Sequence, residues 1–188
     1  MFDWRQHVYL RRAVQLLRQG GIIAYPTEAV WGLGADPFNA EAVASILSLK
    51  QRSVDKGLIV VAAGIEQLAP CRQLSPQQRR QLDTPQPAPV TWLVPNNGLF
   101  PPWICGRHAN VAVRVSRHPV VRSLCLAFGG PIVSTSANPQ GRPAPRFRWQ
   151  ARHYFRQRVD LYTPGCVGEY KRASEIRDLL SGQIIRRG

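Results

Sequence analysis

The chain alternates between helix-like and strand-like patterns of apolar residues. Within 8–18, apolar side chains recur at the three- and four-residue spacing of one helical face, and continuous apolar runs of strand length follow at 21–25 and 57–63. Further helices are expected at 40–50, 75–82, 118–128 and 148–157, with a short one from Ser174, and further strands at 90–94, 111–115, 131–135, 158–162 and 183–186. Because strands that are apolar throughout are usually covered on both faces, the pattern predicts helix–sheet–helix layers around a largely parallel or mixed sheet.

Capping residues support several of these boundaries. Asn39 is suited to cap the helix at 40–50, and Gly129 follows the helix at 118–128 as a C-terminal cap does. The glycine-containing segment 32–36 follows the first polar segment, and its ordinary interpretation is a turn.

Length and composition indicate one folded domain. The chain has 188 residues, 44% of them hydrophobic and 19% charged, which lies outside the range of disordered sequences. No internal repeat or long linker divides it, so we expect a single domain over 1–188. The N-terminus lacks a signal-peptide core and the apolar runs are too short to span a membrane, which predicts a cytoplasmic protein without a membrane partner.

The cysteines and histidines do not form a recognisable metal or redox motif. The four cysteines are Cys71, Cys105, Cys125 and Cys166. Their wide spacing excludes a CxxC pair and a dense disulfide framework, and no cluster of histidines or carboxylates has metal-ligand spacing. We therefore expect buried free thiols in a reducing compartment and no metal held by the protein.

The charge points to anionic partners. Lys and Arg number 25 against 11 Asp and Glu, a net charge of +14, which favours nucleotides or nucleic acid as ligands. Only Lys50, Lys56 and Lys171 are lysines. The proximity of the first two, in a chain that otherwise uses arginine, indicates a site that needs a compact ammonium group.

Three polar segments stand where strands or helices end: 25–28, 50–57 and 134–138. Since ligands of open α/β sheets bind outside the carboxyl ends of strands, we expect the first and third to line one crevice that the second closes from the side. Within the second segment, Lys50, Arg52 and Lys56 would suit phosphates, although a solvated corner is the ordinary interpretation. The sequence has no Walker or Rossmann phosphate loop.

Arg114 and the hydroxyl-rich segment add two open questions. Arg114 lies between Val113 and Val115, so on a strand it faces away from both and needs an anionic partner, either a ligand carboxylate or a structural ion pair. Segment 134–138 is equally explained by a simple turn. The four histidines lie away from the polar segments and no nucleophile elbow is present. A catalytic crevice would therefore act by positioning substrates and neutralising charge.

Five motifs, in this order, resemble the YrdC/Sua5 family in its short bacterial form. They are AYPTEAVWGLGAD, LKQRSVDKGLIVVAA, VAVRV, PIVSTSANPQG and SEIRD, and they extend over nearly the whole chain. The resemblance implies an α/β single-domain fold with a twisted mixed parallel and antiparallel sheet, helices on both faces and a basic concave site. It also implies synthesis of L-threonylcarbamoyl-AMP and pyrophosphate from L-threonine, bicarbonate or CO2, and ATP with Mg²⁺. The product would supply downstream tRNA threonylcarbamoyl-transfer machinery.

The resemblance also implies roles for individual residues. Those that match the KxR/SxN signature or a further nucleotide contact, and so would bind ATP, are Lys50, Arg52, Lys56, Ser136 and Asn138, with Lys50 and Arg52 also catalytic. Those that match the threonine site are Thr27, Ser134 and Arg114, the last as partner of the carboxylate. Ser53 replaces the proline that commonly follows KxR, and the chain ends at Gly188 without the C-terminal Sua5 domain of longer relatives.

A second basic region supports an alternative function, an RNA-binding or ribosome-maturation protein. Residues 142–158 carry six arginines and no acid, and Arg148, Arg152 and Arg156 share one helical face as candidates for RNA contact. The ordinary interpretation is a solvated helix whose aromatic residues pack into the core, and we prefer it here. Those aromatic residues are Phe147, Trp149, Tyr154 and Phe155. A third class, the carbamoyl-transfer domain of hydrogenase maturation proteins, is disfavoured because its acylphosphatase and zinc-finger modules are absent.

Overall fold

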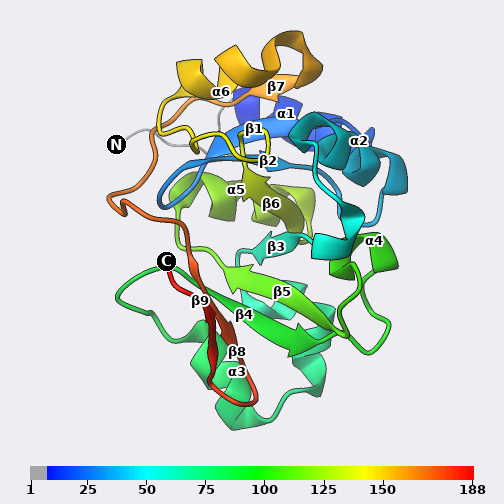
Figure 1. Cartoon of the computed structure of the whole chain (residues 1–188), viewed down its shortest axis with the longest axis vertical. Helices are drawn as coiled ribbons and strands as arrows, with labels where there is room; N and C mark the ends of the chain where they lie inside the picture. Colours follow the sequence, from blue (N-terminus) through cyan, green and yellow to red (C-terminus); the bar gives the residue numbers. More distant parts are fainter. Residues whose placement is uncertain (1–7) are drawn as a thin grey trace.

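The computed structural model describes residues 8–188, which form one nine-stranded sheet with helices against it (Figure 1). The strands are β1 (Ile23–Pro26), β2 (Trp31–Gly34), β3 (Ile59–Ala62), β4 (Val90–Pro95), β5 (Asn110–Val115), β6 (Ile132–Ser136), β7 (Leu161–Tyr162), β8 (Glu175–Asp178) and β9 (Ile184–Arg186). The α-helices are α1 (Val8–Arg18), α2 (Ala40–Lys50), α3 (Pro76–Asp83), α4 (Pro102–Cys105), α5 (Pro119–Phe128) and α6 (Arg148–Phe155).

The sheet is mixed, as predicted. Its order is β7-β1-β2-β6-β3-β5-β4-β8-β9, and the pairs β1–β7, β3–β5 and β4–β8 are parallel while the other neighbours are antiparallel. Each parallel pair joins strands far apart in the sequence, because a parallel neighbour requires a long crossover connection. The predicted fold class, an α/β fold with a twisted mixed sheet, is confirmed.

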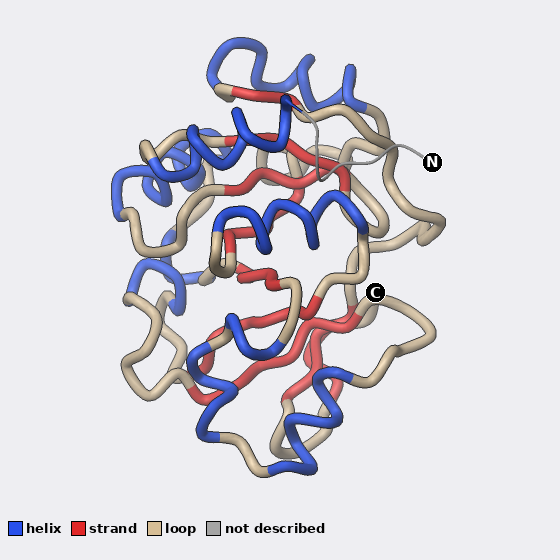
Figure 2. The backbone as a smooth tube through the Cα atoms, turned by 180° about the vertical axis from the view of Figure 1, so that it is seen from behind, coloured by secondary structure: helices blue, strands red, loops and turns tan. Residues whose placement is uncertain are grey.

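Helices cover both faces of the sheet, and the alternation of side chains along β3 divides the core accordingly. Val60 and Ala62 belong to the larger hydrophobic cluster, which includes residues of α2 and α6, whereas Val61 and Ala63 belong to a second cluster with α1 and α5. Successive strand residues point to opposite faces, so one apolar run contributes to both clusters. The view from behind shows helices lying across the face that carries the second cluster (Figure 2).

The helix caps agree with the sequence. The Asn39 side chain accepts a 2.9 Å hydrogen bond from the Ala42 backbone at the start of α2. Ser75 and Gln78 form a reciprocal capping box at the start of α3. Gly129 ends α5 in the left-handed conformation, with φ of 88°. Local signals therefore decide where these helices begin and end.

Two predicted elements are wrong. The short helix from Ser174 is instead strand β8, because residues 175–178 pair in parallel with β4 and the Ser174 hydroxyl lies 2.7 Å from that of Thr91. The interpretation of 32–36 as a turn is wrong for residues 32–34, which belong to β2 and pair with β1 and β6. Two further elements are shorter than predicted, since the helix at 148–157 continues only as a 3-10 turn after 155 and the strand at 158–162 is confined to 161–162.

The cysteines follow the prediction only in part. All four are free, and Cys71, Cys105 and Cys125 are buried, but Cys166 is exposed on the loop after β7. That loop contacts the start of α5 through its backbone, where the Cys166 carbonyl pairs with the ring of the N-cap residue His118 at 3.1 Å, so the thiol itself is left outside. Across 8–188, no helix is long and apolar enough to cross a membrane.

Close packing explains why β2 contains glycine. A Cβ atom at Gly34 would lie 2.5 Å from the Tyr25 ring and 3.0 Å from the Val133 carbonyl oxygen. Tyr25 is fully buried and donates a 3.0 Å hydrogen bond to that same oxygen. The tyrosine ring thus occupies the space that a side chain on β2 would need, and glycine is required there.

We expect Gly34→Ala to reduce the free energy of unfolding by about 1–3 kcal/mol, the usual cost of overpacking a buried site. Denaturant titration measures the change. Gly130→Ala is the matched control, since its Cβ would have only one neighbour, 4.0 Å away. Equal stability of Gly34→Ala and the wild type would contradict this account of β2.

Candidate active site

The three polar segments meet around one cavity of about 770 Å³. Every residue that the sequence assigned to ATP or threonine lines it: Thr27, Lys50, Lys56, Arg52, Arg114, Ser134, Ser136 and Asn138. The volume lies in the range of pockets for small molecules and cofactors. The structure therefore brings together residues that are more than a hundred positions apart in the chain.

The cavity lies on the same face of the sheet as α1 and α5, which cover another part of that face. Arg114 on β5 pairs with Val61 on β3, which pairs in turn with Ile132 on β6. Paired residues share a face, and Val61 and Ile132 pack with α1 and α5. Arg114 accordingly points away from Val113, which lies in the opposite core cluster, as its position on an alternating strand predicts.

The lining is strongly cationic. Its six cationic side chains belong to Lys50, Lys56, Arg52, Arg107, Arg114 and Arg186. Among residues 8–188, Glu28 is the one acidic residue of the lining. Charges of one sign in a concave site raise its affinity for ligands of the opposite sign, so the cavity is suited to a polyanion such as a triphosphate.

Lys50 connects the end of α2 with the end of β6. Its ammonium group donates to the backbone carbonyls of Ser136 and Asn138, the latter at 2.8 Å, and only 4% of the residue is exposed. Burial, together with the positive charge of Arg52, lowers its pKa to about 8. An ammonium has three N–H donors, so one remains for a ligand after the two carbonyls.

Arg52 and Lys56 belong to the loop that follows α2. Arg52 donates a 3.0 Å hydrogen bond to the Gly57 carbonyl, which holds its guanidinium beside the cavity, while its Nε is buried without a partner. Burial and the nearby charge of Arg186 lower the Arg52 pKa. Lys56 reaches across to Gln140 at 3.1 Å. This loop thus provides two cations, one constrained and one exposed.

Asn138 organises the loop after β6. Its amide donates to the carbonyls of Pro139 and Arg142, at 3.1 Å and 2.6 Å, and its Oδ1 is buried without a partner. The backbone N–H of Gln140 donates to the Lys50 carbonyl at 2.8 Å. The asparagine therefore fixes a loop that borders the cavity, and it retains one free acceptor.

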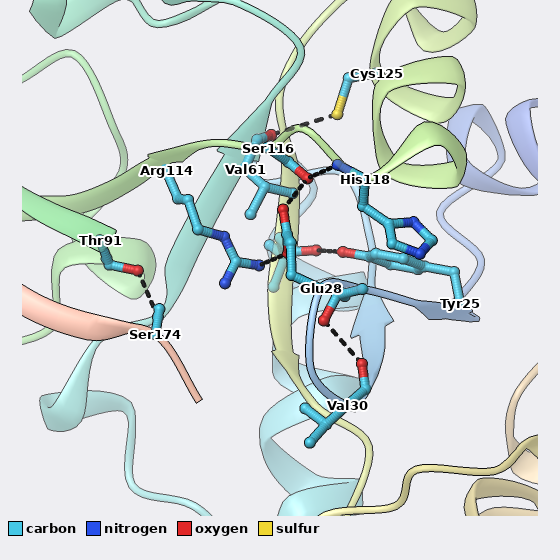
Figure 3. A network of polar contacts seen from close by, with 12 residues as sticks. Tyr25, Glu28, Val30, Val61, Thr91, Arg114, Ser116, His118, Cys125 and Ser174 are labelled. Carbon is cyan, nitrogen blue, oxygen red and sulfur yellow. Dashed lines mark hydrogen bonds and ion pairs between the residues drawn. The ribbon is translucent and has the colours of Figure 1, made fainter. Parts of the chain in front are cut away.

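Glu28 and Arg114 form a buried ion pair at the cavity wall (Figure 3). Arg114 Nη2 lies 3.5 Å from Glu28 Oε2, and the Ser116 hydroxyl donates to Oε1 at 2.5 Å. Burial raises the pKa of the Glu28 carboxyl, but Arg114 and Ser116 outweigh it, and the pKa ends below its ordinary value. The sequence allows two partners for Arg114, a ligand carboxylate or a structural ion pair. The structure contains the ion pair, and Arg114 also lines the cavity.

Thr27 and Ser134 are both buried beside this pair. The Thr27 hydroxyl donates to the Val30 carbonyl at 2.8 Å and closes the turn between β1 and β2, so it offers a ligand only an acceptor. Ser134 is 5% exposed and belongs to β6, where it pairs with Ile59. Both residues restrict the shape of the cavity close to the Glu28 carboxylate.

Several lining residues were not predicted from the sequence. They are Glu28, Arg107, His108, Ser174 and Arg186. Glu28 and Ser174 lie within the five motifs, but no role was predicted for either. Arg186 reaches the cavity only because β9 pairs with β8. The expectation that all histidines lie away from the polar segments is wrong for His108, since α4 and its following loop bring it to the cavity. His7 lies outside the described residues.

His118 lies at the start of α5, where a residue before Pro119 is suited to cap the helix. It is the N-cap residue of α5, but its side chain makes no capping bond and pairs instead with the Cys166 carbonyl at 3.1 Å. Burial lowers its pKa, so the ring is held neutral. Because a neutral imidazole that donates from Nε2 carries a lone pair on Nδ1, its buried Nδ1 is an unfilled acceptor.

Unpartnered polar atoms concentrate at the cavity. Of the six buried side-chain atoms in 8–188 that lack a hydrogen bond, four belong to lining residues: Glu28 Oε2, Arg52 Nε, Arg114 Nε and Asn138 Oδ1. Buried polar groups are normally hydrogen-bonded, and exceptions require an explanation. A ligand with both donors and acceptors would supply the missing partners.

The candidate RNA-contact residues lie elsewhere. Arg148, Arg152 and Arg156 are exposed on or just after α6 and do not line the cavity. The expectation that the neighbouring aromatic residues pack into the core is correct for Phe155 but wrong for Phe147 and Trp149, which are 59% and 67% exposed. Phe147 is the N-cap residue of α6 and Trp149 lies in its first turn, and their rings lie nearly parallel with centroids 6.4 Å apart.

Residues 8–188 contain no group of three or more histidine, cysteine or acidic side chains suited to hold a metal ion. Ser136 and Asn138 are among the lining residues that carry neutral oxygen donors, and Asn138 Oδ1 is unpartnered. Hard cations such as Mg²⁺ bind oxygen ligands and often take most of them from substrate phosphates. These residues fit a cation that is bound chiefly by a nucleotide.

Comparison with known proteins identifies close relatives. A threonylcarbamoyl-AMP synthase of Cellvibrio japonicus (strain Ueda107) is 52% identical over 187 residues, which cover 99% of each chain. A second, from Saccharophagus degradans, is also 52% identical over 187 residues and covers 99% of this chain and 98% of the relative.

Solved structures share the fold. P. abyssi Sua5 complexed with L-threonine superposes with a TM-score of 0.81 at 30% identity, and the match covers 90% of this chain and 50% of that protein, so this chain spans half its length. E. coli YciO has a TM-score of 0.81 at 21% identity, with 96% and 89% coverage, which supports the fold alone. The Sua5_yciO_yrdC family model, described as telomere recombination, matches residues 15–188. With most of its length matched by this model, the chain belongs to the Sua5/YciO/YrdC family.

Proposed function

We propose that the protein is an L-threonylcarbamoyl-AMP synthase. It joins L-threonine, bicarbonate or CO2, and ATP into L-threonylcarbamoyl-AMP and releases pyrophosphate. The observation that carries this proposal is the convergence of all eight sequence-assigned residues on one cationic cavity. Relatives that bear this activity in their names match nearly the entire chain.

The two ends of the cavity suit the two larger substrates. Lys50, Arg52 and Lys56, with Ser136 and Asn138 beside them, would bind the triphosphate, because the free ammonium proton and the unpartnered Arg52 Nε are donors. Arg114, Thr27 and Ser134 line the region around Glu28 and would bind threonine, with the Arg114 guanidinium on its carboxylate.

The reaction needs no protein nucleophile. The threonine amine, once it has lost its proton, adds to CO2 and gives a carbamate and a second proton. A carbamate oxygen then attacks the α-phosphorus in line, and the bond to pyrophosphate breaks. Negative charge spreads over phosphate oxygens in the transition state, so Lys50 and Arg52 act as catalytic groups by stabilising it.

Mg²⁺ bound to the nucleotide would supply further neutralisation of the phosphate charge. Ser136 and Asn138 are the residues whose oxygens suit contact with that cation. The protein would act in the cytoplasm, where ATP, threonine and bicarbonate are available. Its product would be consumed by the downstream machinery that transfers the threonylcarbamoyl group to tRNA.

We expect the purified protein to form threonylcarbamoyl-AMP from ATP, Mg²⁺, threonine and bicarbonate, detected by mass spectrometry. Arg52→Ala should lower kcat/KM for ATP by about 10² to 10³-fold, since removal of one transition-state charge contact costs about 2–4 kcal/mol. Arg11→Ala, which removes an exposed arginine from α1, is the matched control and should leave the rate unchanged.

Omitting threonine should abolish both the product and the release of pyrophosphate. Unchanged pyrophosphate release by Arg52→Ala would overturn the assignment of the phosphate site. A wild-type protein that releases pyrophosphate equally well without threonine would overturn the reaction itself.

Binding of ATP should weaken as the pH rises through about 8. The Lys50 pKa is lowered to about 8, so the ammonium is charged below this pH and loses its proton above it. Titration calorimetry should give a Kd for ATP about fivefold to tenfold higher at pH 9 than at pH 7. Lys50→Gln should bind ATP weakly with a flat profile. If the ATP affinity of Lys50→Gln fell with pH as that of the wild type does, a group other than Lys50 would be responsible for the pH dependence.

RNA binding is a second candidate function, favoured by the surface at α6. Arg148, Arg152 and Arg156 make no ion pair within the described residues, and exposed Phe147 and Trp149 add a flat aromatic surface beside them. Cationic side chains interleaved with aromatic rings suit single-stranded nucleic acid, whose phosphates and bases they contact respectively.

We expect the triple substitution of Arg148, Arg152 and Arg156 by glutamine to reduce the salt dependence of tRNA binding. Each phosphate contact on a single strand contributes a slope of about 0.7, so log Kd against log[salt] should flatten by about two. Product formation should not change. Substitution of Arg11, Arg12 and Arg18 on α1 removes the same charge and is the control. Equal slopes for the two triple variants would exclude this surface.

A further inference from the structure

Phosphate binding does not explain why Glu28 lies in this cavity. In the part of the chain that the structure describes, its carboxylate is the single acidic group that lines the cavity, beside six cationic side chains, and only 9% of the residue is exposed. A buried anion in a site for anionic substrates opposes their binding and requires a compensating role.

Its partners leave the carboxylate incompletely satisfied. Oε1 accepts the Ser116 hydroxyl at 2.5 Å, but Oε2 has no hydrogen bond, and its distance of 3.5 Å to Arg114 Nη2 is that of a loose ion pair. Arg114 Nε is buried without a partner as well. A purely structural ion pair in a buried site is expected to satisfy both groups, since removal of charges from water is otherwise costly.

The surroundings hold Glu28 in place without neutralising it. Ser116 also accepts the His118 backbone N–H at 3.2 Å (Figure 3). The Thr27 hydroxyl closes the preceding turn. Gly168 packs directly on the Glu28 backbone, where an added Cβ would lie 2.7 Å from its carbonyl oxygen. The carboxylate is thus positioned in advance and stays charged, because Arg114 and Ser116 keep its pKa below the ordinary value.

We propose that the Glu28 carboxylate binds the α-ammonium group of the amino-acid substrate while Arg114 binds its carboxylate. A free amino acid carries these two opposite charges on neighbouring atoms, and the Glu28–Arg114 pair presents the complementary charges in one cavity wall. The inference rests on the proposed function and adds a recognition element to it. Glu28 therefore selects α-amino acids over hydroxy acids, and it acts on binding before the amine loses its proton.

The test compares ligands as well as variants. L-threonine and 2,3-dihydroxybutyrate, in which a hydroxyl replaces the amine, are titrated into the full-length protein by calorimetry. Glu28→Gln keeps the size of the side chain and its acceptor for Ser116 but removes the charge. It should weaken binding of threonine by about 10- to 100-fold, the effect of one charged hydrogen bond, and change binding of dihydroxybutyrate by less than about twofold. Glu175→Gln removes an acid that does not line the cavity and should alter neither.

Equal weakening of both ligands by Glu28→Gln would overturn the inference, because it would mean that Glu28 acts only through Arg114. If Glu28→Gln fails to fold, the wild-type protein still tests the proposal. It should bind threonine at least about tenfold more tightly than dihydroxybutyrate. Product formation with no such preference would overturn the role of Glu28 and leave the proposed function intact. Absence of both threonine binding and product would overturn both.

Discussion

The buried ammonium of Lys50 is the interaction on which the cavity depends, because it joins the end of α2 to the end of β6 through two backbone carbonyls. Residues two apart on a helix point to nearly opposite sides, yet Lys50 and Arg52 line the same cavity. The left-handed conformation of Gln51, with φ of 53°, turns the chain between them. The KxR spacing therefore describes a helix end rather than a helical face: Lys50 holds the end of β6, and Arg52 lies in the loop after α2.

The charge of the protein divides into parts with different environments. At the cavity, cations are constrained by carbonyl groups and balanced by one carboxylate, so they are available to a ligand in fixed positions. On α6 the arginines are exposed and unconstrained, and solvent and salt screen them. The first arrangement favours a small polyanion of defined shape, and the second favours an extended polyanion whose contacts vary. The net charge of the chain does not by itself distinguish between these two kinds of polyanion.

Sequence reasoning was accurate where the signal is local. The cap at Asn39 and the alternation around Arg114 depend on a few neighbouring residues, and the structure agrees with both. It failed where a distant contact decides the outcome: β2 is a strand because β1 and β6 pair with it, and the segment after Ser174 is a strand because β4 is beside it. Of the site, the cationic half could be predicted from spacing, whereas Arg186 required the strand order of the sheet.

The position of β8 in the sheet has a consequence for synthesis of the chain on the ribosome. β4 is made some eighty residues before β8, and until the later strand emerges β4 has β5 as its only sheet neighbour. A nascent chain at that stage exposes the open edge of β4 and leaves the Thr91 hydroxyl without Ser174. Open strand edges of apolar sequence pair readily with other chains. The interval before β8 is therefore the period in which this protein most needs protection from aggregation.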